Sequence, residues 1–246
     1  GKGSFPDFDR FMASLKGKGV PIHAQATATE QDIELIKLST VEKDAYQKIS
    51  RYINYGGTEN FRNLLLYVAN QFAGAKHKVQ EPKRPPWEGI YHPDFSYIPS
   101  LDEYLEKRYK KGRLTVGLWF YQSFWMAKNT LFVDSLIKEI ERQNANIIPV
   151  FIYSVEDKEL GTRGVPWVVE NYFMKDGRSI IDVLISPLMF SLRMKLGRGA
   201  EGSEITGREN EGFLEKLGVP VIKAILTFNT FKEWQDTLQG LNPLDI

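Results

Sequence analysis

The sequence predicts an α/β protein, with a helical N-terminal segment followed by a Rossmann-like or flavodoxin-like parallel sheet that carries helices on both faces. Two observations lead to this prediction. After residue 113, apolar runs alternate with helical segments, which is typical of parallel strands buried on both faces. Before residue 113, apolar residues recur mainly at helical spacing, and glycines and prolines separate the segments.

Residues 1–42 are expected to be the remnant of a preceding α/β domain. Apolar residues at helical spacing between Phe8 and Leu15 predict a helix. The sequence VPIHAQA at 20–26 predicts a single strand. Because a lone strand is not stable by itself, it would have to join a sheet formed elsewhere.

Residues 43–112 are expected to form a helical segment with a proline-rich connector. One helix is predicted over 43–55. A second helix would begin with Thr58 as its N-cap and end before Gly74, a residue that suits the left-handed position after a helix. The second helix has an apolar stripe made of Phe61, Leu64, Leu65, Val68 and Phe72.

The connector itself covers 75–99 and contains five prolines, so it is expected to be extended rather than helical. Ser100 and Glu103 then form a capping box, which predicts a third helix that runs to about Lys111 and stops at Gly112.

Residues 113–246 are expected to form the Rossmann-like α/β domain. Strands are predicted at 114–121, 147–153, 180–185 and 220–226. Helices are predicted at about 129–143, 165–174, 209–217 and 231–239, and Thr230 with Glu233 forms a capping box for the last one.

The composition narrows the class of protein. The chain has 246 residues, 42% of them hydrophobic, and a formal net charge of +1, so nothing indicates a nucleic-acid partner. It has no cysteine, which excludes disulfide and thiolate chemistry. No apolar run reaches the roughly 20 residues of a membrane span. The first residues have no apolar core that would make them a signal peptide, so a cytoplasmic protein is expected.

Familiar motifs are absent or in the wrong context. Gly197, Gly199 and Gly202 match G-x-G-x-x-G, but they do not lie between a strand and a helix, so 197–210 is expected to be a flexible loop. There is no Walker A motif and no G-x-S-x-G nucleophile elbow. The three histidines are widely spaced, and no metal site is expected.

Polar and aromatic side chains gather where the first strand of the predicted sheet ends. The segment from Tyr121 to Thr130, called the elbow below, follows that strand directly. Ligands of open parallel sheets bind outside the carboxyl ends of the strands, so the elbow is a candidate ligand site. Two simpler interpretations stay open: Ser123, Asn129 or Thr130 caps the next helix, or Trp125 belongs to the core.

His92 is a second candidate. It lies in the sequence Tyr91-His92-Pro93-Asp94, and an imidazole there could bind a metal or donate a proton. On chemistry alone we favour a loop histidine that is bonded to backbone, with Asp94 as a turn former.

Several segments are distinctive in combination: GGTENFRNLLLYVAN, GIYHPD, GLWFYQSFWMAKNTLFVDSLIKEIERQNANIIPVFIYS and the C-terminal LGVPVIKAILTFNTFKEWQDTLQGLNPLD. Together they resemble the large-subunit family of cobaltochelatase and magnesium chelatase. The family elbow reads roughly Tyr-Arg-Ser-His-Trp-x-x-Gly-Asn-Thr, and a strand close to Pro-Val-Phe-x-Tyr-Ser follows. The resemblance covers about residues 45–246, and the cobalt-type subunit is the more similar of the two.

The resemblance implies a function. Such a subunit binds a tetrapyrrole macrocycle and, with an AAA+ ATPase and a linker subunit as partners, inserts a divalent metal, Co²⁺ or else Mg²⁺ or Ni²⁺. ATP would act through the partner, and no cofactor is expected in this chain. The chain would be an N-terminal portion of a longer protein and inactive alone, with its catalytic residues unidentified. Residues that match the family, and so are expected to bind substrate, are His92, Tyr121, Ser123, Trp125, Asn129 and Thr130.

Three positions of the elbow depart from the family pattern. Gln122, Phe124 and Lys128 stand where the family often has Arg, His and Gly. If that histidine handles metal or substrate, this chain lacks it, which bears on whether it supports chelation. Two other functions stay open: a docking module for the AAA+ ATPase that never touches the macrocycle, and a stand-alone nucleotide-binding α/β domain.

Overall fold

The structure is a computed structural model that describes all residues except 1–6, 27–32, 189–210, 228 and 237–246. The chain divides into two compact units, Gly1–Pro85 and Pro86–Ile246. The boundary lies inside the proline-rich connector. The predicted loop at 197–210 lies outside the described residues.

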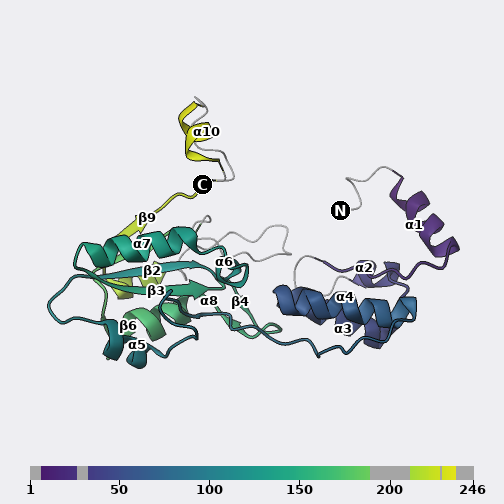
Figure 1. Cartoon of the computed structure of the whole chain (residues 1–246), viewed down its shortest axis with the longest axis horizontal. Coiled ribbons are helices and arrows are strands. Elements are labelled where there is room, and N and C mark those ends of the chain that lie inside the picture. Colours follow the sequence, from purple (N-terminus) through teal and green to yellow (C-terminus); the bar gives the residue numbers. More distant parts are fainter. Residues whose placement is uncertain (1–6, 27–32, 189–210, 228, 237–246) are drawn as a thin grey trace. The chain divides into compact units, whose positions relative to one another are not determined.

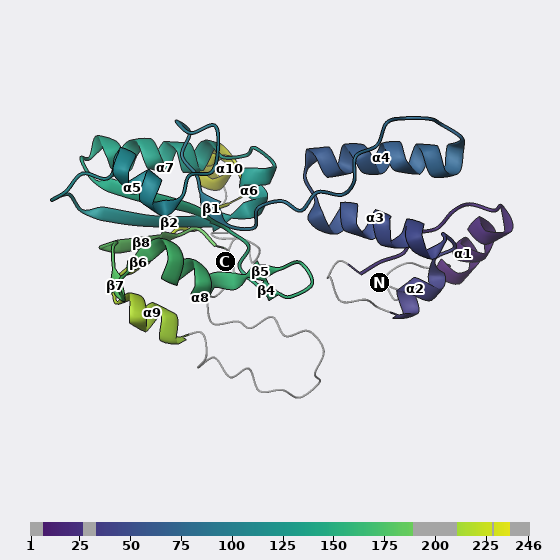
Figure 2. The same cartoon turned by 90° about the horizontal axis from the view of Figure 1, so that it is seen from below.

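The first unit is helical. It contains α1 (Phe8–Gly17), α2 (Ile33–Leu38), α3 (Lys43–Tyr55) and α4 (Thr58–Ala73), and α3 and α4 lie side by side (Figure 2). The bounds of α3 match the prediction, and Gly74 adopts the expected left-handed conformation after α4. The predicted capping role of Thr58 is wrong: Thr58 is already helical, and Gly57 with φ 81° occupies the N-cap. A glycine there makes the sharp turn between the two helices possible.

The strand predicted at 20–26 is not formed. This segment has no strand partner among the described residues. The Ile22 carbonyl accepts the Thr40 N–H at 2.9 Å, and side-chain hydroxyls accept two N–H groups of the segment. Thr40 Oγ1 accepts the Ile22 N–H at 2.9 Å, and Ser39 Oγ accepts the Ala24 N–H at 2.9 Å. Hydroxyl groups of this kind can replace a neighbouring strand as hydrogen-bond partners.

Helix α4 binds the extended connector through asparagine side chains. Asn60 Oδ1 accepts the Lys83 N–H at 2.9 Å, and Asn60 Nδ2 donates to the Lys83 carbonyl at 2.8 Å. Asn63 accepts the Gln80 N–H at 2.8 Å. The predicted apolar stripe of α4 is therefore not the face that packs against the connector, and within this unit its members Phe61, Leu65 and Phe72 are exposed.

The second unit is built on a five-stranded sheet of order β1-β3-β2-β8-β9. Strands β3, β2, β8 and β9 are parallel to one another, and β1 is antiparallel to β3 at the edge. The sheet strands are β1 (Gly89–Ile90), β2 (Thr115–Tyr121), β3 (Asn146–Ile152), β8 (Val183–Ser186) and β9 (Val221–Lys223). Two small hairpins are β4 (Glu156–Asp157) with β5 (Thr162–Arg163) and β6 (Met174–Lys175) with β7 (Arg178–Ser179).

Helices cover both faces of this sheet, as predicted. Figure 1 shows α7 (Leu131–Arg142) on one side and α5 (Leu101–Arg108) and α8 (Gly164–Val168) on the other. Side chains alternate accordingly along β2: Leu118 and Phe120 pack in the cluster under α7, and Trp119 packs in the opposite cluster. Gly117 lies so close to this second cluster that an added Cβ would be 2.6 Å from Ile181 Cδ1.

Some predicted elements differ in extent. The strand predicted at 180–185 begins only at Val183, because Ser179–Asp182 form the turn out of β7. The helix predicted at 165–174 is α8 followed by a π-helical turn, η1 (Val169–Phe173). Helix α5 ends at Arg108, before the predicted Lys111. The remaining helices of the unit are α6 (Gln122–Met126), α9 (Glu211–Leu217) and α10 (Phe231–Asp236).

Both capping boxes of this unit form. Ser100 Oγ accepts the Glu103 N–H at 3.2 Å, and Thr230 Oγ1 accepts the Glu233 N–H at 3.3 Å. The sheet unit begins at Pro86 rather than at 113, since β1 pairs with β3. The assignment of residues 1–42 to a preceding domain stays a prediction.

Candidate functional site

The elbow begins without a loop. Strand β2 ends at Tyr121, which is also the N-cap of α6, so the chain turns directly from strand to helix at the carboxyl edge of the parallel sheet. Gln122 is buried here, and its Nε2 donates a hydrogen bond to the Pro86 carbonyl at 2.9 Å. The half-buried Tyr121 ring packs against the cluster that contains Trp119. The sheet therefore holds the start of the elbow rigidly.

The elbow then turns through Lys128, which has φ 56°, a left-handed conformation. The Ala127 N–H donates to the Ser123 carbonyl at 2.9 Å, and the Asn129 N–H donates to the Phe124 carbonyl at 2.8 Å. These bonds close α6 in the manner of a left-handed helix terminus, a position that glycine occupies without strain. The Gly of the family pattern coincides with this position.

No side chain of the elbow caps a helix. Tyr121 before α6 and Thr130 before α7 make no capping hydrogen bond, so the capping interpretation of Ser123, Asn129 and Thr130 is wrong. The side chains of Ser123 and Asn129 are instead exposed. They are free to contact a ligand.

Trp125 is a half-buried platform. Its indole ring stacks on Phe151 of β3, with centroids 4.4 Å apart and an angle of 8° between the planes. It is packed against the cluster under α7 without being enclosed by it. Trp125 is therefore not the fully buried core residue of the simpler interpretation, although it does pack against the core.

Tyr91 connects the second candidate segment to the elbow. Its hydroxyl donates to Asp134 Oδ1 at 2.7 Å and lies 2.9 Å from Thr130 Oγ1. Burial raises the pKa of the Tyr91 hydroxyl, so it stays protonated as the donor. The loop that contains His92 therefore touches the elbow through Tyr91.

His92 itself lies elsewhere. It is 2% exposed, and its Nδ1 accepts the Asp94 N–H at 3.1 Å, as in the favoured loop interpretation. Its Nε2 faces Glu141 at 3.4 Å and Arg108 Nη2 at 3.0 Å. Burial, and then the charge of Arg108, lower the pKa of His92, so the ring is neutral at pH 7. The geometry does not group His92 with the elbow, and its role in substrate binding stays a prediction.

Glu88 is a site residue that sequence reasoning missed. It precedes β1, whose antiparallel pairing with β3 places Glu88 at the carboxyl edge. Its side chain is only 14% exposed, and within the described residues its nearest charged partner is Arg163, with Nε 3.9 Å from Oε1. Burial raises the pKa of the carboxyl. Nothing in the sequence indicated this, because Glu88 stands in the connector beside prolines.

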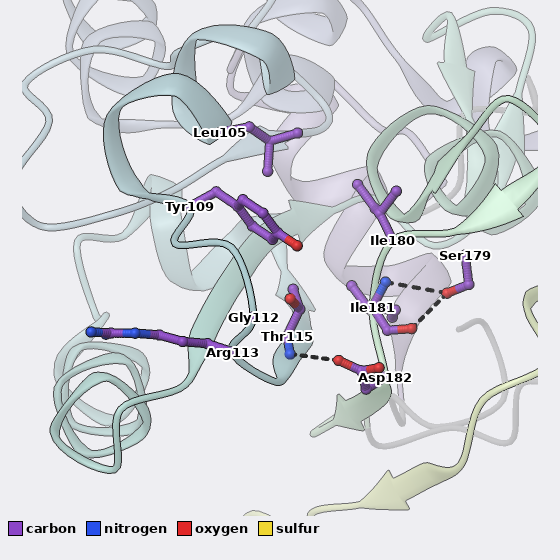
Figure 3. A pocket seen from close by; sticks show the side chains of 9 residues that line it. All are labelled: Leu105, Tyr109, Gly112, Arg113, Thr115, Ser179, Ile180, Ile181 and Asp182. Carbon is purple, nitrogen blue, oxygen red and sulfur yellow. Dashed lines mark hydrogen bonds between the residues drawn. The ribbon is translucent and has the colours of Figure 1, made fainter.

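Two cavities that described residues line lie at the opposite, amino edge of the sheet. The larger, of about 530 Å³, lies between α5 and the strand ends (Figure 3). Two hydrogen-bonded contacts lie in its lining: the Thr115 N–H donates to Asp182 Oδ2 at 2.7 Å, and Ser179 bonds the backbone of Ile181. The smaller, of about 270 Å³, lies at the start of β3. Neither cavity is near the elbow.

The described part of the chain holds neither a metal site nor a membrane-spanning helix. No three His, Asp or Glu residues gather there in a way that could hold a metal ion. None of the described helices is both long and apolar enough to cross a membrane.

Comparisons with known proteins agree with the sequence resemblance. The family model CobN/Magnesium Chelatase matches residues 50–246. An uncharacterized protein of Methanocaldococcus jannaschii is 34% identical over all of this chain and 20% of its own length. The aerobic cobaltochelatase subunit CobN of Pseudomonas aeruginosa is 24% identical over 87% of this chain and 16% of its own length.

The fold agrees as well. The solved structure of the catalytic subunit of cobaltochelatase from Mycobacterium tuberculosis matches 98% of this chain and 18% of that chain, with a TM-score of 0.59 at 18% identity. This chain thus spans about a fifth of the length of the relatives that it matches.

Proposed function

Because the chain belongs to the CobN/magnesium chelatase family, we propose that it is part of the large subunit of an ATP-dependent metal chelatase and contributes to binding the tetrapyrrole. Cobalt insertion into a corrin precursor is the specific reaction we favour, since the elbow and the strand after it resemble the cobalt-type subunit more. The metal ion would be a substrate of the whole complex rather than a resident of this chain.

The observation that carries the proposal is the geometry of the elbow. A flat macrocycle with carboxylate or amide arms needs an aromatic surface to pack on and short polar groups at its rim. Trp125 offers a partly exposed ring that stacks on Phe151, and the exposed Ser123 and Asn129 lie in the same short segment. The site would be rigid, because α6 follows β2 directly and the Trp125 ring stacks on a residue of β3.

The partners are what the family resemblance implies: an AAA+ subunit would hydrolyse ATP and would be joined through a linker subunit. This chain itself contains no Walker A motif. Metal insertion also requires a base to remove the pyrrole protons, and carboxylates or histidines usually serve. The elbow lacks both, so we place the chemistry outside it. A complex of this kind would work in the cytoplasm.

An absorbance titration with a metal-free porphyrin that bears two carboxylate arms tests the proposal. We expect a saturable shift of the porphyrin band, with an affinity reduced at least fivefold by Trp125→Ala and also by the pair Ser123→Ala and Asn129→Ala. Lys138→Gln, an exposed change on α7, serves as the control and should leave the affinity unchanged.

Two results would contradict the proposal. A folded chain that gives no saturable shift does not bind the macrocycle at the elbow. If that chain nevertheless binds the ATPase subunit in a pull-down, the alternative function, a docking module, is supported instead.

A further inference from the structure

The segment between α5 and β2 is a basic loop with a fixed backbone. It comprises residues 109–114, and the buried side chain of Asn146 at the start of β3 holds it. Asn146 Oδ1 accepts the Lys110 N–H at 2.9 Å, and its Nδ2 donates to the Lys110 carbonyl at 3.0 Å and to the Arg113 carbonyl at 3.4 Å. The positions of the charged residues in this loop are therefore set before any ligand arrives.

The loop forms one wall of the smaller cavity, here called the basic cavity, of about 270 Å³. Its charged lining consists of Lys107, Arg108, Lys110, Arg113 and Glu141. Four of these side chains are cationic and one is anionic, so the lining has a formal charge of +3. An excess of this size in a concave site attracts anions.

Existing ion pairs account for only part of this charge. Lys107 bonds Glu103 at 2.7 Å, and Arg108 bonds both Glu141 and Asp94, the latter at 2.9 Å. Lys110 and Arg113 have no carboxylate within ion-pair distance in the described part of the chain. Two cations of the basic cavity thus have no ion-pair partner there, and with Glu103 and Asp94 included the whole cluster has a formal charge of +1.

Arg113 also borders the larger cavity, but its side chain does not enter it. Figure 3 shows the Arg113 side chain directed away from the other side chains of that cavity. Its guanidinium group therefore belongs to the charge of the basic cavity.

The basic cavity is distinct from the elbow. It lies at the start of β2 and β3, whereas the elbow follows the end of β2. Strand β2 has seven residues, and at roughly 3.3 Å per residue its ends are about 20 Å apart. One macrocycle cannot contact both places.

We propose that the basic cavity binds the phosphate group of a small anion. Two unpaired cations match the double negative charge of a phosphate, whereas a single carboxylate would neutralise one. Arginine adds a planar set of donors that fits phosphate oxygens. An acidic peptide is the poorer fit, because the lining offers little apolar surface for neighbouring side chains. The inference does not depend on the proposed function.

Calorimetric titration of this chain at low ionic strength tests the inference, with inorganic phosphate, inorganic diphosphate and ADP as separate probes. We expect saturable binding of diphosphate, and Lys110→Gln with Arg113→Gln together should reduce its affinity at least tenfold. Tighter binding of ADP than of diphosphate identifies a nucleotide as the source of the phosphate, and equal binding identifies the free anion.

The matched control is Lys138→Gln with Lys158→Gln, which removes the same charge outside the cavity and should change the affinity less than twofold. A thermal melt of each variant shows that it is folded. The inference is overturned if diphosphate does not bind, if the control loses as much affinity as the cavity variant, or if an acidic peptide binds at the cavity and diphosphate does not displace it.

Discussion

The indole ring of Trp125 lies on the phenyl ring of Phe151, at 4.4 Å between centroids and nearly parallel. One ring comes from the elbow and the other from the carboxyl end of β3, so the pair joins the elbow to the sheet. A stacked aromatic pair contributes about 0.5–1.5 kcal/mol beyond the area that it buries. The contact therefore supports the fold, while part of the Trp125 side chain stays exposed.

Replacing Trp125 with alanine should lower the free energy of unfolding by about 1–3 kcal/mol, less than the roughly 3–5 kcal/mol of a fully buried tryptophan. The reason is that Trp125 is only half-buried. Urea denaturation followed by circular dichroism measures the difference. A loss of about 3–5 kcal/mol or more would mean that Trp125 is a core residue and would weaken the case for a ligand platform. Trp119→Ala, at a fully buried position, is the reference for the larger loss.

Replacing Lys128 with glycine should stabilise the protein. A side chain in the left-handed conformation costs about 1–2 kcal/mol, and glycine would remove this cost. Glycine also gives the unfolded chain more conformational freedom, which lowers the gain in stability by roughly 0.5–1 kcal/mol. We expect a net increase of about 0.5 kcal/mol in urea denaturation. The control is Lys138→Gly, in the interior of α7, which should destabilise by about 1 kcal/mol. If both changes destabilise equally, the elbow does not hold Lys128 in this conformation.

The asparagine contacts of α4 give a third prediction. Asn60→Ala removes both hydrogen bonds to the Lys83 backbone and should cost about 1–3 kcal/mol of stability in the first unit. Amide hydrogen exchange at Lys83 should become faster at the same time. Gln71→Ala, an exposed change on the same helix, should alter stability by no more than about 0.5 kcal/mol. Unchanged exchange at Lys83 would show that the connector is held by other contacts.

Sequence patterns among neighbouring residues predicted much of this fold. The bounds of α3, the two serine or threonine capping boxes, and the alternation of buried strands with helices depend on residues close together in sequence. The elbow was predicted for the same reason, because its position after a strand is a sequence property. Exposure of Ser123 and Asn129 was not predictable, since capping would have used the same residue types.

The features that were not predicted depend on distant partners. Strand β1 has two residues, too few for a sequence pattern, and it exists because β3 pairs with it. The segment at 20–26 has the apolar pattern of a strand, but it is held by the Thr40 backbone N–H and by the hydroxyl groups of Ser39 and Thr40 rather than by a neighbouring strand. The position of His92 beside Arg108 and Glu141 likewise depends on residues 16 and 49 positions away.

The last prediction concerns Glu88 and pH. Because burial raises its pKa in the folded state, the folded protein holds the proton more tightly than the unfolded chain does. Stability should therefore be greatest below the unfolded pKa, near the ordinary 4.5, and should fall as pH rises through the folded pKa. Glu88→Gln cannot ionise, so the variant should have a higher melting temperature than the natural sequence at pH 7, and the difference should vanish below about pH 4.

Arg163→Gln is the complementary variant, because the charge of Arg163 opposes the upward pKa shift of Glu88. Without that charge, the ionised carboxylate is less stable in the fold, so the variant should lose more melting temperature at pH 7 than at pH 4. Thermal melts of both variants between pH 4 and 8 test whether Glu88→Gln raises and Arg163→Gln lowers the melting temperature at pH 7. If Glu88→Gln destabilises at pH 7, the carboxylate is a stabilising partner of Arg163 in its ionised form, and burial does not dominate at this site.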